Sequence, residues 1–539
     1  MSVNSLPNCE ESNHSYSRRE IRVICILIAT LIPFYTAVEI STFICDQYTF
    51  YSFLTERGLP YGYELPIDTN KSVNEEIKLK RQEAQSQTSM VQSSNNFAAV
   101  APGLVSTLLV GYLSDRFGRK VALGILIAGE AAQLVAVAVV VFYRLTPWAL
   151  VISNVIEGFI GGGLLSAIAQ FSVCIADLTK CDQDQNYNFA KKAVYDRRRW
   201  LFLTIVDGLA CLSLAVANMI AGPLIYKYGF DTTMAVCIIV YIPVVLLICI
   251  LPETNSKIQS NYLCINDTNN TSIKTGTRNE TEMSSCCDKF QWKIKQIMRA
   301  VMSSHPVLIV ILMIQLLVSI SAMVDSPFTT VYLMSEPFWW NSRRLGLTNG
   351  IVDTCSSVLS IAAVNLLVRY QKSAMAKQSK PMNTNDDSLG IDRQNDRINL
   401  RFRRTLFGLL ITALILMLIN RILMTVAFLP SSSTANIIVY IAIVAKLAKN
   451  INFPLLRTLV TNWSSTQRQG LILSFASFIS RIGLLISVSA LPLVYSATLS
   501  YFPGAVFLIC ASLLLVALCA SVSLFFVAKH QRLNSSVLN

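Results

Sequence analysis

Long apolar stretches alternate with short polar ones along all 539 residues of the chain. Each apolar stretch is close to the roughly 20 residues that a helix needs to cross about 30 Å of hydrocarbon. A chain built from such helices is an all-α membrane protein, and their number argues against a channel or receptor with six or seven spans. The pattern predicts twelve transmembrane helices, at residues 22–45, 95–113, 121–142, 147–170, 201–225, 233–251, 306–333, 344–368, 404–428, 435–458, 469–494 and 503–528.

The widest polar interruption, residues 252–305, divides the predicted helices into six and six. It contains NDTNNTSIKTGTRNETEMSS, which is too poor in apolar residues to fold alone, so we expect a disordered cytosolic linker. The helices then form two six-helix halves, 22–251 and 306–528. The other polar segments are predicted to be a cytosolic tail at 1–21, an outside loop at 46–90, a cytosolic loop at 371–400 and a cytosolic tail at 529–539.

Charge is distributed unevenly across the predicted membrane. Of the chain, 53% is hydrophobic and only 14% is charged, and the formal net charge is +13. With the N-terminus inside, the cytosolic segments carry 32 Lys and Arg residues and the outside loops carry nine. Membrane proteins concentrate Lys and Arg in their cytosolic loops. The positive charge therefore indicates orientation in a lipid bilayer, with both termini cytosolic, and does not indicate a nucleic-acid partner.

No arrangement of residues in the sequence is typical of an enzyme or a metal site. The fourteen cysteines lack zinc-ligand spacing, and most lie in or beside apolar spans, where cysteine behaves as a small hydrophobe. The three histidines lie in the tails or at the edge of span seven. We therefore expect no enzyme, no bound metal and no cofactor. The tails carry no convincing dileucine or tyrosine sorting signal, which favours the plasma membrane over the lysosomal membrane.

The stretch GYLSDRFGRK, at 111–120 between predicted spans two and three, matches the major facilitator loop pattern G-x-L-x-D-R-x-G-R-K. Its first glycine would let span two approach a neighbour, and its second would permit a tight turn. Its aspartate would accept hydrogen bonds from the second arginine and face a helix N-terminus of the other half. PET at 252–254 is a weaker signature of the same superfamily. The predicted conformational switch comprises Gly111, Asp115, Arg116, Gly118, Arg119 and Lys120.

Four further stretches carry a family resemblance: GFIGGGLLSAIAQFSVCIAD at 158–177, YLMSEPFWWNSRRLG at 332–346, RQGLILSFASF at 468–478 and YSATLSYFPG at 495–504. Together they resemble solute carrier family 46, the family of the proton-coupled folate transporter and the thymic stromal cotransporter. They lie in both predicted halves and in the family's order. The resemblance implies a major facilitator fold and proton-coupled uptake of a small organic solute.

The chain departs from this family at positions that matter for function. The folate transporter has a histidine in span seven that takes part in proton coupling, and residues 306–333 contain none. The family's helix-five glutamate aligns with Asp207, and Glu157 lies one turn before its helix-four acidic position. Trp339 stands where the family commonly has a cysteine bonded to the first outside loop, and that loop has no cysteine beyond Cys45. We therefore expect carboxylates, in place of the histidine, to couple protons. The identity of the transported solute stays open.

Charged residues inside spans cost about 2.5–3.5 kcal/mol each on insertion scales, so retained ones usually line a cavity or pair. Those of the N-terminal half are acidic, whereas the C-terminal half holds several cations. Either the cations bind an anion opposite protonatable acids, or the charges form ion pairs, for example Asp353 with Arg421. The helical spacing of 446, 449 and 450 predicts one shared face.

Two sets of site residues follow from these charges. The predicted proton-coupling residues are Asp207, Glu157, Asp325 and Glu130. The predicted substrate-binding residues are Lys446, Lys449, Asn450, Arg421 and Arg481.

The sequence thus predicts a transporter that binds a small organic anion, folate-like or drug-like, and takes it up with protons by alternating access. A proton gradient would drive it without a cofactor. An antiporter that exchanges drugs for protons shares the loop pattern and is the first alternative. A receptor or scaffold that no longer transports is the second, which the retained intramembrane charges disfavour.

The predicted outside loop 46–90 carries two further features. NEEIKLKRQEAQ has a helical composition and predicts a short surface helix. NKS at Asn70 is the glycosylation sequon that we expect to be used, since the sequons at 266, 269, 270 and 279 fall in the predicted cytosolic linker.

We expect Asn70→Gln to abolish the mobility shift that glycosidase treatment produces in the wild-type protein. Asn266→Gln and Asn279→Gln serve as controls and should leave that shift intact. A glycan on either linker residue would reverse the predicted orientation.

Overall fold

A computed structural model describes the chain as helices joined by short connections. Within the part of the chain that it describes there is no β-strand. The described residues are all except 1–17, 60–70, 162, 179–188, 255–305, 323–326, 377–387, 430, 464–468 and 538–539. Asn70, Asp325 and all but the first three residues of the predicted linker therefore lie outside the described residues.

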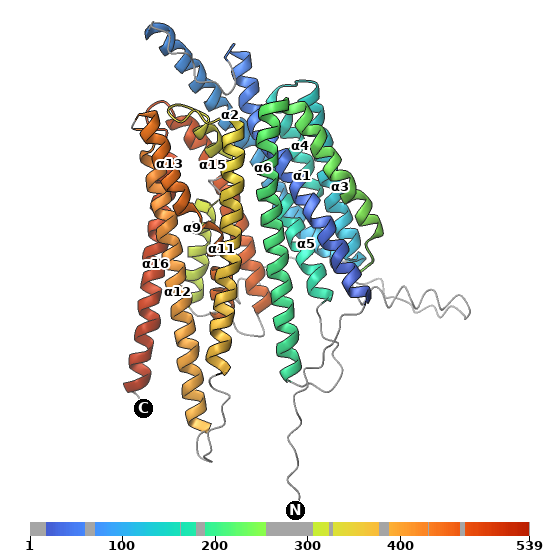
Figure 1. The fold of residues 1–539 in the computed structure, drawn as a ribbon. Helices are drawn as coiled ribbons and strands as arrows, with labels where there is room; N and C mark the ends of the chain where they lie inside the picture. The colour runs from blue at the N-terminus through green and yellow to red at the C-terminus, as the bar shows by residue number, and fades with distance from the viewer. Residues whose placement is uncertain are drawn as a thin grey trace, which may run out of the picture.

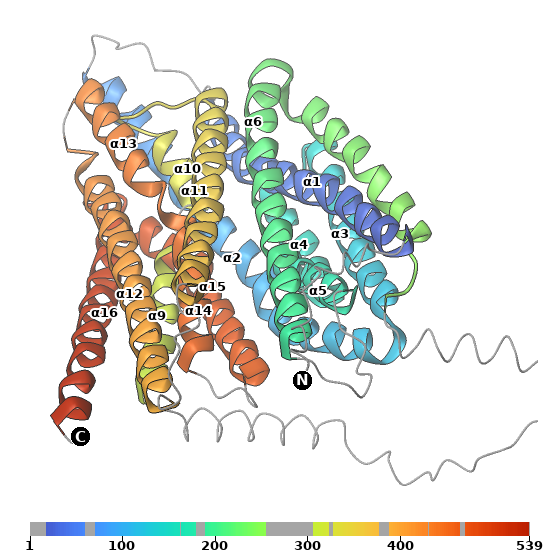
Figure 2. The same cartoon turned by 60° about the horizontal axis from the view of Figure 1, so that its bottom comes forward.

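The helices gather into two groups, an N-terminal half and a C-terminal half, which stand side by side (Figures 1 and 2). The N-terminal half contains α1 (Arg18–Glu56), α2 (Lys71–Phe117), α3 (Arg119–Phe142), η1 (Pro147–Ala149), α4 (Leu150–Ile160), α5 (Gly163–Leu178) and α6 (Phe189–Ile250). The C-terminal half contains α9 (Pro306–Ala322), α10 (Pro327–Leu333), α11 (Ser342–Ala376), α12 (Ser388–Val426), α13 (Ser432–Lys446), η5 (Lys449–Ile451), α14 (Asn452–Trp463), α15 (Gln469–Thr498) and α16 (Ala505–Val537).

Eight of the described helical segments are long and apolar enough to cross a membrane. Shorter apolar helices accompany them, at Pro147–Ile160, Ser166–Ile175 and Pro306–Ala322. Each predicted span overlaps one or more described helices, and α6 covers two spans across a turn at Gly229, whose φ is 81°. The all-α membrane fold is thus confirmed, and the count of twelve remains a prediction.

Two predicted spans are not single helices among the described residues. Span four is divided into α4 and α5, with Gly163 at φ 70°, and span ten is divided into α13, η5 and α14. The prediction of continuous helices there was wrong, because hydropathy records average polarity and not the backbone turns at glycines or polar residues. Broken helices in transporters commonly expose backbone groups near a substrate or ion.

The predicted outside loop 46–90 is mostly helical. α1 continues to Glu56, and α2 begins at Lys71, so the helix expected around NEEIKLKRQEAQ exists as the first turns of α2. It does not lie freely on the surface, because Arg81, Ala84 and Gln85 are buried. We call the side of the molecule that carries this segment the outer side.

The halves meet along α6 and α11, which run next to each other in both views (Figures 1 and 2). A Cβ at Gly346 would lie 2.6 Å from the Asn218 carbonyl oxygen and 2.7 Å from Gly222 Cα. One turn along, a Cβ at Gly350 would lie 2.7 Å from the Ala215 carbonyl oxygen. The two backbones are therefore in direct contact, as small residues four apart allow in membrane helices.

Buried apolar side chains form two main clusters. One joins the N-terminal half to the outer ends of the C-terminal helices, including Tyr332, Trp340 and Tyr495. The other lies within the C-terminal half, among α9, α12, α14, α15 and α16. The halves thus share a core on the outer side and have separate cores on the opposite, inner side.

Gly346→Val should separate α6 from α11 and destabilise the protein by about 1–3 kcal/mol, the usual cost of forcing extra carbons into a packed contact. The measurement is thermal unfolding in detergent. Gly408→Val on α12 is the matched control, because a Cβ at Gly408 would meet no atom within 4 Å. Equal losses in the two variants would show that helix propensity, not the contact, sets the effect.

Candidate functional site

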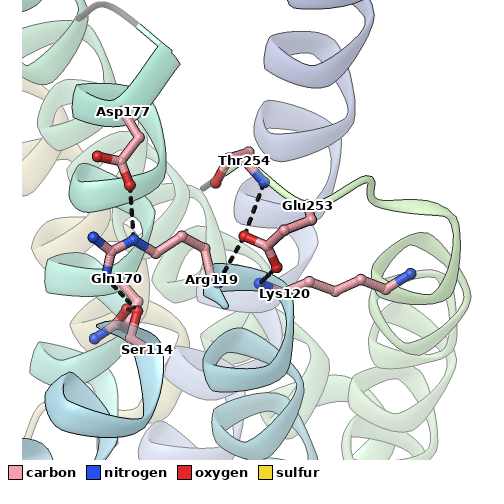
Figure 3. Close-up of polar contacts among 7 residues, drawn as sticks. All are labelled: Ser114, Arg119, Lys120, Gln170, Asp177, Glu253 and Thr254. Atoms are coloured by element: carbon pink, nitrogen blue, oxygen red, sulfur yellow. Dashed lines mark hydrogen bonds and ion pairs between the residues drawn. The ribbon is translucent and has the colours of Figure 1, made fainter. Parts of the chain in front are cut away.

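The GYLSDRFGRK stretch forms the junction between α2 and α3 (Figure 3). Gly118 separates the two helices with φ 110°, a conformation that favours glycine. A Cβ there would also lie 2.8 Å from Glu253 Cδ. The Glu253 carboxylate accepts the backbone N–H groups of Arg119 at 2.9 Å and Lys120 at 3.1 Å. It therefore caps the positive N-terminus of α3, and the tight turn predicted at Gly118 is present.

Arg119 binds the end of α5. Its Nε donates to Asp177 Oδ2 at 2.7 Å, and both side chains are nearly buried, with 11% and 7% of their surface exposed. Its NH1 donates to Ser114 Oγ at 2.8 Å, and Ser114 donates to Gln170 Oε1 at 2.8 Å (Figure 3). These contacts hold α2, α3 and α5 together on the inner side.

The other switch residues differ in how far their surroundings match the expectation. A Cβ at Gly111 would meet no described atom within 4 Å, so the expected close approach of span two to a neighbour at that glycine stays a prediction. Arg116 is exposed and donates to the Tyr112 hydroxyl at 3.1 Å. Lys120 Nζ donates to the Cys249 carbonyl at 2.8 Å. The expected contact of Asp115 with Arg119 falls outside the described side chains.

A second group of charges lies between the halves. Lys449, in η5, forms an ion pair with Asp353 of α11, and 18% and 22% of the two side chains is exposed. On the facing half, Asn218 Nδ2 of α6 donates to Glu39 Oε1 of α1 at 2.9 Å. Glu39 also interacts electrostatically with Asp353 and Lys449. Lys449, two carboxylates and the Asn218 amide, from four elements, thus come together where the halves face each other.

This arrangement corrects two expectations about the C-terminal cations. Lys446 ends α13 and Lys449 begins a 3₁₀ turn, so 446, 449 and 450 do not share one face of a continuous helix. Asp353 pairs with Lys449, and not with Arg421 as the ion-pair alternative supposed. Arg421 is 1% exposed and donates to the Ser321 carbonyl at 2.8 Å, which ties α12 to α9.

The remaining substrate-binding candidates lie on either side of this group. Asn450 accepts a hydrogen bond from Ser360 Oγ at its carbonyl, at 3.1 Å, which fixes η5 against α11. Lys446 is half-buried. Arg481, on α15, crosses between the halves and donates to Thr107 Oγ1 of α2 at 2.6 Å. Thr107 in turn shares a hydrogen bond with Ser166 of α5.

Two of the four proton-coupling candidates come together. Glu157, on α4, accepts from Gln133 Nε2 at 2.9 Å and interacts electrostatically with Glu130 of α3. Glu130 is 4% exposed, and its Oε1 has no hydrogen-bond partner among the described residues. The sequence predicted Asp207 and Asp325 as further coupling residues. Asp207 lies on α6, but its side chain is not among those described, and Asp325 lies outside the described residues. Among the described residues, no group of acidic, histidine or cysteine side chains could hold a metal ion.

Sequence reasoning missed four partners that the structure supplies. Glu253 was readable from PET, but only as a superfamily signature, and its cap on α3 depends on a contact across 134 residues. Asp177 and Glu39 were visible as acids without a stated partner. Asp353 was noted with the wrong cation, because a sequence does not show where span ten breaks.

Comparison with known proteins gives likenesses over nearly the whole length. No family model matches the chain. It is 20% identical to a human lysosomal proton-coupled steroid conjugate and bile acid symporter, over 87% of each chain. Among solved structures, a nucleoside transporter, NupG, matches 92% of this chain and all of its own, with a TM-score of 0.56 and 9% identity. A D-xylose-proton symporter matches 93% and 97%, with a TM-score of 0.54 and 14% identity. These proteins are transporters, not enzymes.

Asp177→Ala should leave the Arg119 guanidinium buried without its carboxylate and cost about 3–5 kcal/mol, as breaking one side of a buried pair does. Removing both charges, as Asp177→Ala with Arg119→Met, should cost less than the sum of the single variants. Thermal unfolding in detergent measures both.

The exposed pair Arg144–Asp231, whose side chains are 48% and 49% exposed, is the control. Asp231→Ala should cost at most about 1 kcal/mol. Additive losses at 119 and 177 would contradict the buried pairing.

Proposed function

We propose that the chain is a major facilitator transporter of solute carrier family 46 and, within it, a proton-coupled symporter of small organic anions, as its likeness to the human lysosomal symporter and to the fold of solved transporters supports. The observation that carries the proposal is the meeting of Lys449, Asp353 and Glu39 between the two halves. Alternating access moves the halves against each other about such a central site. A site made from both halves is therefore rearranged at each turn of the cycle.

The charges of this group account for coupling. Lys449 and Asp353 neutralise each other in the structure. An anionic substrate that binds Lys449 displaces Asp353, and a carboxylate left without its cation inside a membrane is costly. Protonation of that carboxylate removes the cost. One monovalent anion and one proton together leave the charge of the site unchanged, so each favours the binding of the other.

The acids of the N-terminal half provide a second place for the proton. Glu157 and Glu130 interact electrostatically from α4 and α3, and a proton bound to either would remove the repulsion between their like charges. Asp207 and Asp325 remain candidates for the same role. The α2–α3 junction, with Asp115 and Arg119, acts in this scheme as the switch between outward-facing and inward-facing states.

Two observations support an organic anion as the substrate: the cations between the halves and the substrates that the human relative's name gives. Steroid conjugates and bile acids, which the human relative's name gives as its substrates, are mostly apolar organic anions. Lys449 suits the anionic group of such a molecule, and Arg481 or Lys446 offers a second cation. We keep the plasma membrane as the proposed location. The lysosomal location of the relative makes the lysosomal membrane the alternative, which co-localisation of a tagged chain with organelle markers distinguishes.

Uptake into proteoliposomes with an inward proton gradient tests the proposal. We expect a sulfated steroid or a bile acid to accumulate, and folate serves as a further probe. Collapse of the gradient with a protonophore should remove accumulation and leave exchange of labelled for unlabelled substrate. Proton-driven efflux would favour the antiporter, and no flux of any probe would favour the receptor or scaffold.

Lys449→Gln should weaken anion binding by about 1–3 kcal/mol, because a buried partner loses a charged hydrogen bond. The measurement is the KM of uptake, with the exposed Lys227→Gln as control. Normal uptake by Lys449→Gln would limit this lysine to a structural pair.

Neutralising a coupling acid should flatten the pH dependence of uptake while substrate exchange persists. We expect this for Asp353→Asn, and for Glu157→Gln or Asp207→Asn if those acids carry the proton. Wild-type pH profiles in all three variants would move coupling to Glu130 or Asp325.

A further inference from the structure

A buried arginine lies on the outer side, beyond the predicted end of span two. Arg81 belongs to the first turns of α2, and 4% of its surface is exposed. Its NH2 donates to the Met334 carbonyl at 3.0 Å. Its guanidinium lies 4.5 Å from the centre of the Trp339 ring and 5.8 Å from that of Phe50. Burial of a cation in this way is compatible with stability only because these groups replace water.

These contacts join the two halves. Arg81 and Phe50 come from α2 and α1, whereas Met334 and Trp339 belong to the segment between α10 and α11. Trp339 has φ 55°, which is uncommon for a bulky residue and requires surroundings that hold it in place. We call Arg81, Phe50, Met334 and Trp339 the outer clasp.

Further bonds between the halves follow α2 inward from the outer clasp. Ser86 and Ser496 share a hydrogen bond of 2.6 Å, Ser93 donates to the Ser489 carbonyl, and Asn96 donates to the Val488 carbonyl at 3.3 Å. At the rim, Lys78 forms an ion pair of 3.3 Å with Glu336. The outer parts of α2 and α15 are thus bonded over several turns.

The inner side offers a contrast. Arg481 of α15 still donates to Thr107 of α2, inward of Asn96. Nearer the inner end of α2, the bonds described for Ser114, Arg119 and Lys120 all go to other residues of the N-terminal half. The shared apolar core also lies on the outer side, and the inner core of the C-terminal half is separate. This distribution is that of a transporter closed on its outer side.

We propose that the outer clasp closes the outer side and that Arg81 is its positioning residue. For the outer side to open, the guanidinium must leave the Trp339 ring and the Met334 carbonyl together, because all three lie at one junction of the halves. The strength of this contact then sets how often the outer side opens. The inference concerns the conformational equilibrium and does not depend on which solute is carried.

Labelling of Ser93→Cys with a membrane-impermeant maleimide, added from the outer side, tests the clasp. Ser93 is 5% exposed and lies behind the clasp, so labelling in the otherwise wild-type chain should be slow. Arg81→Ala should raise the labelling rate at least severalfold. The same chains without Ser93→Cys give the background from the fourteen native cysteines.

Arg57→Ala is the matched control. Arg57 also lies on the outer side, with Nε 3.6 Å from Glu83 Oε2, but this pair joins α1 to α2 within the N-terminal half. Loss of this ion pair in Arg57→Ala should leave the rate of labelling at position 93 at the wild-type value. Arg81→Lys keeps the charge without the planar group that stacks on a ring, so it should label at an intermediate rate.

Trp339→Ala and Trp339→Phe keep the test decisive if Arg81→Ala does not fold. Trp339→Ala should label as fast as Arg81→Ala, and Trp339→Phe, which retains an aromatic face, should stay close to wild type. Labelling at the wild-type rate in folded Arg81→Ala or Trp339→Ala would overturn the proposal. An equal rise in Arg57→Ala would overturn it too.

Discussion

The contact of α6 with α11 is the constraint on which the other arrangements depend. At Gly346 the two helix backbones touch without side chains between them, and at Gly350 the Met219 side chain and the Ala215 carbonyl approach as closely. Lipid gives helices no hydrophobic reason to associate, so such packing must itself hold the halves together. Because the contact runs through glycines, the two helices pack closely, and no large side chain at these glycine positions interlocks to prevent α6 from tilting against α11. Everything else between the halves can then be exchanged during a cycle.

The charged groups occupy the places where helices are interrupted or where the halves face each other. Lys449 lies in the break of span ten, and Glu157 lies a turn before the break of span four. A break frees backbone groups and lets a short segment turn toward a partner, as η5 does toward Asp353. Charged residues, which are energetically costly inside a membrane, are therefore retained at the helix breaks and at the interface between the halves, where rearrangement is expected. The inner α2–α3 junction is instead held within one half.

The sequence predicted the membrane fold, the positions of the helices and the tight turn at Gly118, because hydropathy and a ten-residue pattern are local signals. It placed charges at Glu157 and Lys449 correctly within spans. It failed on partners: Asp177 for Arg119, Asp353 for Lys449 and Glu130 for Glu157. Each of these depends on how far helices rotate and where they break, which local patterns do not record. The helix in loop 46–90 was predicted, but its burial against the other half was not.

The Gly118–Glu253 contact has a genetic consequence. A side chain at 118 meets two separate obstacles, the left-handed backbone and the Glu253 carboxylate. Shortening residue 253 would remove the collision, but it would leave the backbone conformation unfavourable and would uncap α3 as well. A second substitution at 253 is therefore not expected to rescue a variant that carries a side chain at 118. Revertants of a Gly118 variant should regain glycine itself. Loss of this glycine in a duplicated gene would therefore be difficult to compensate by changes elsewhere.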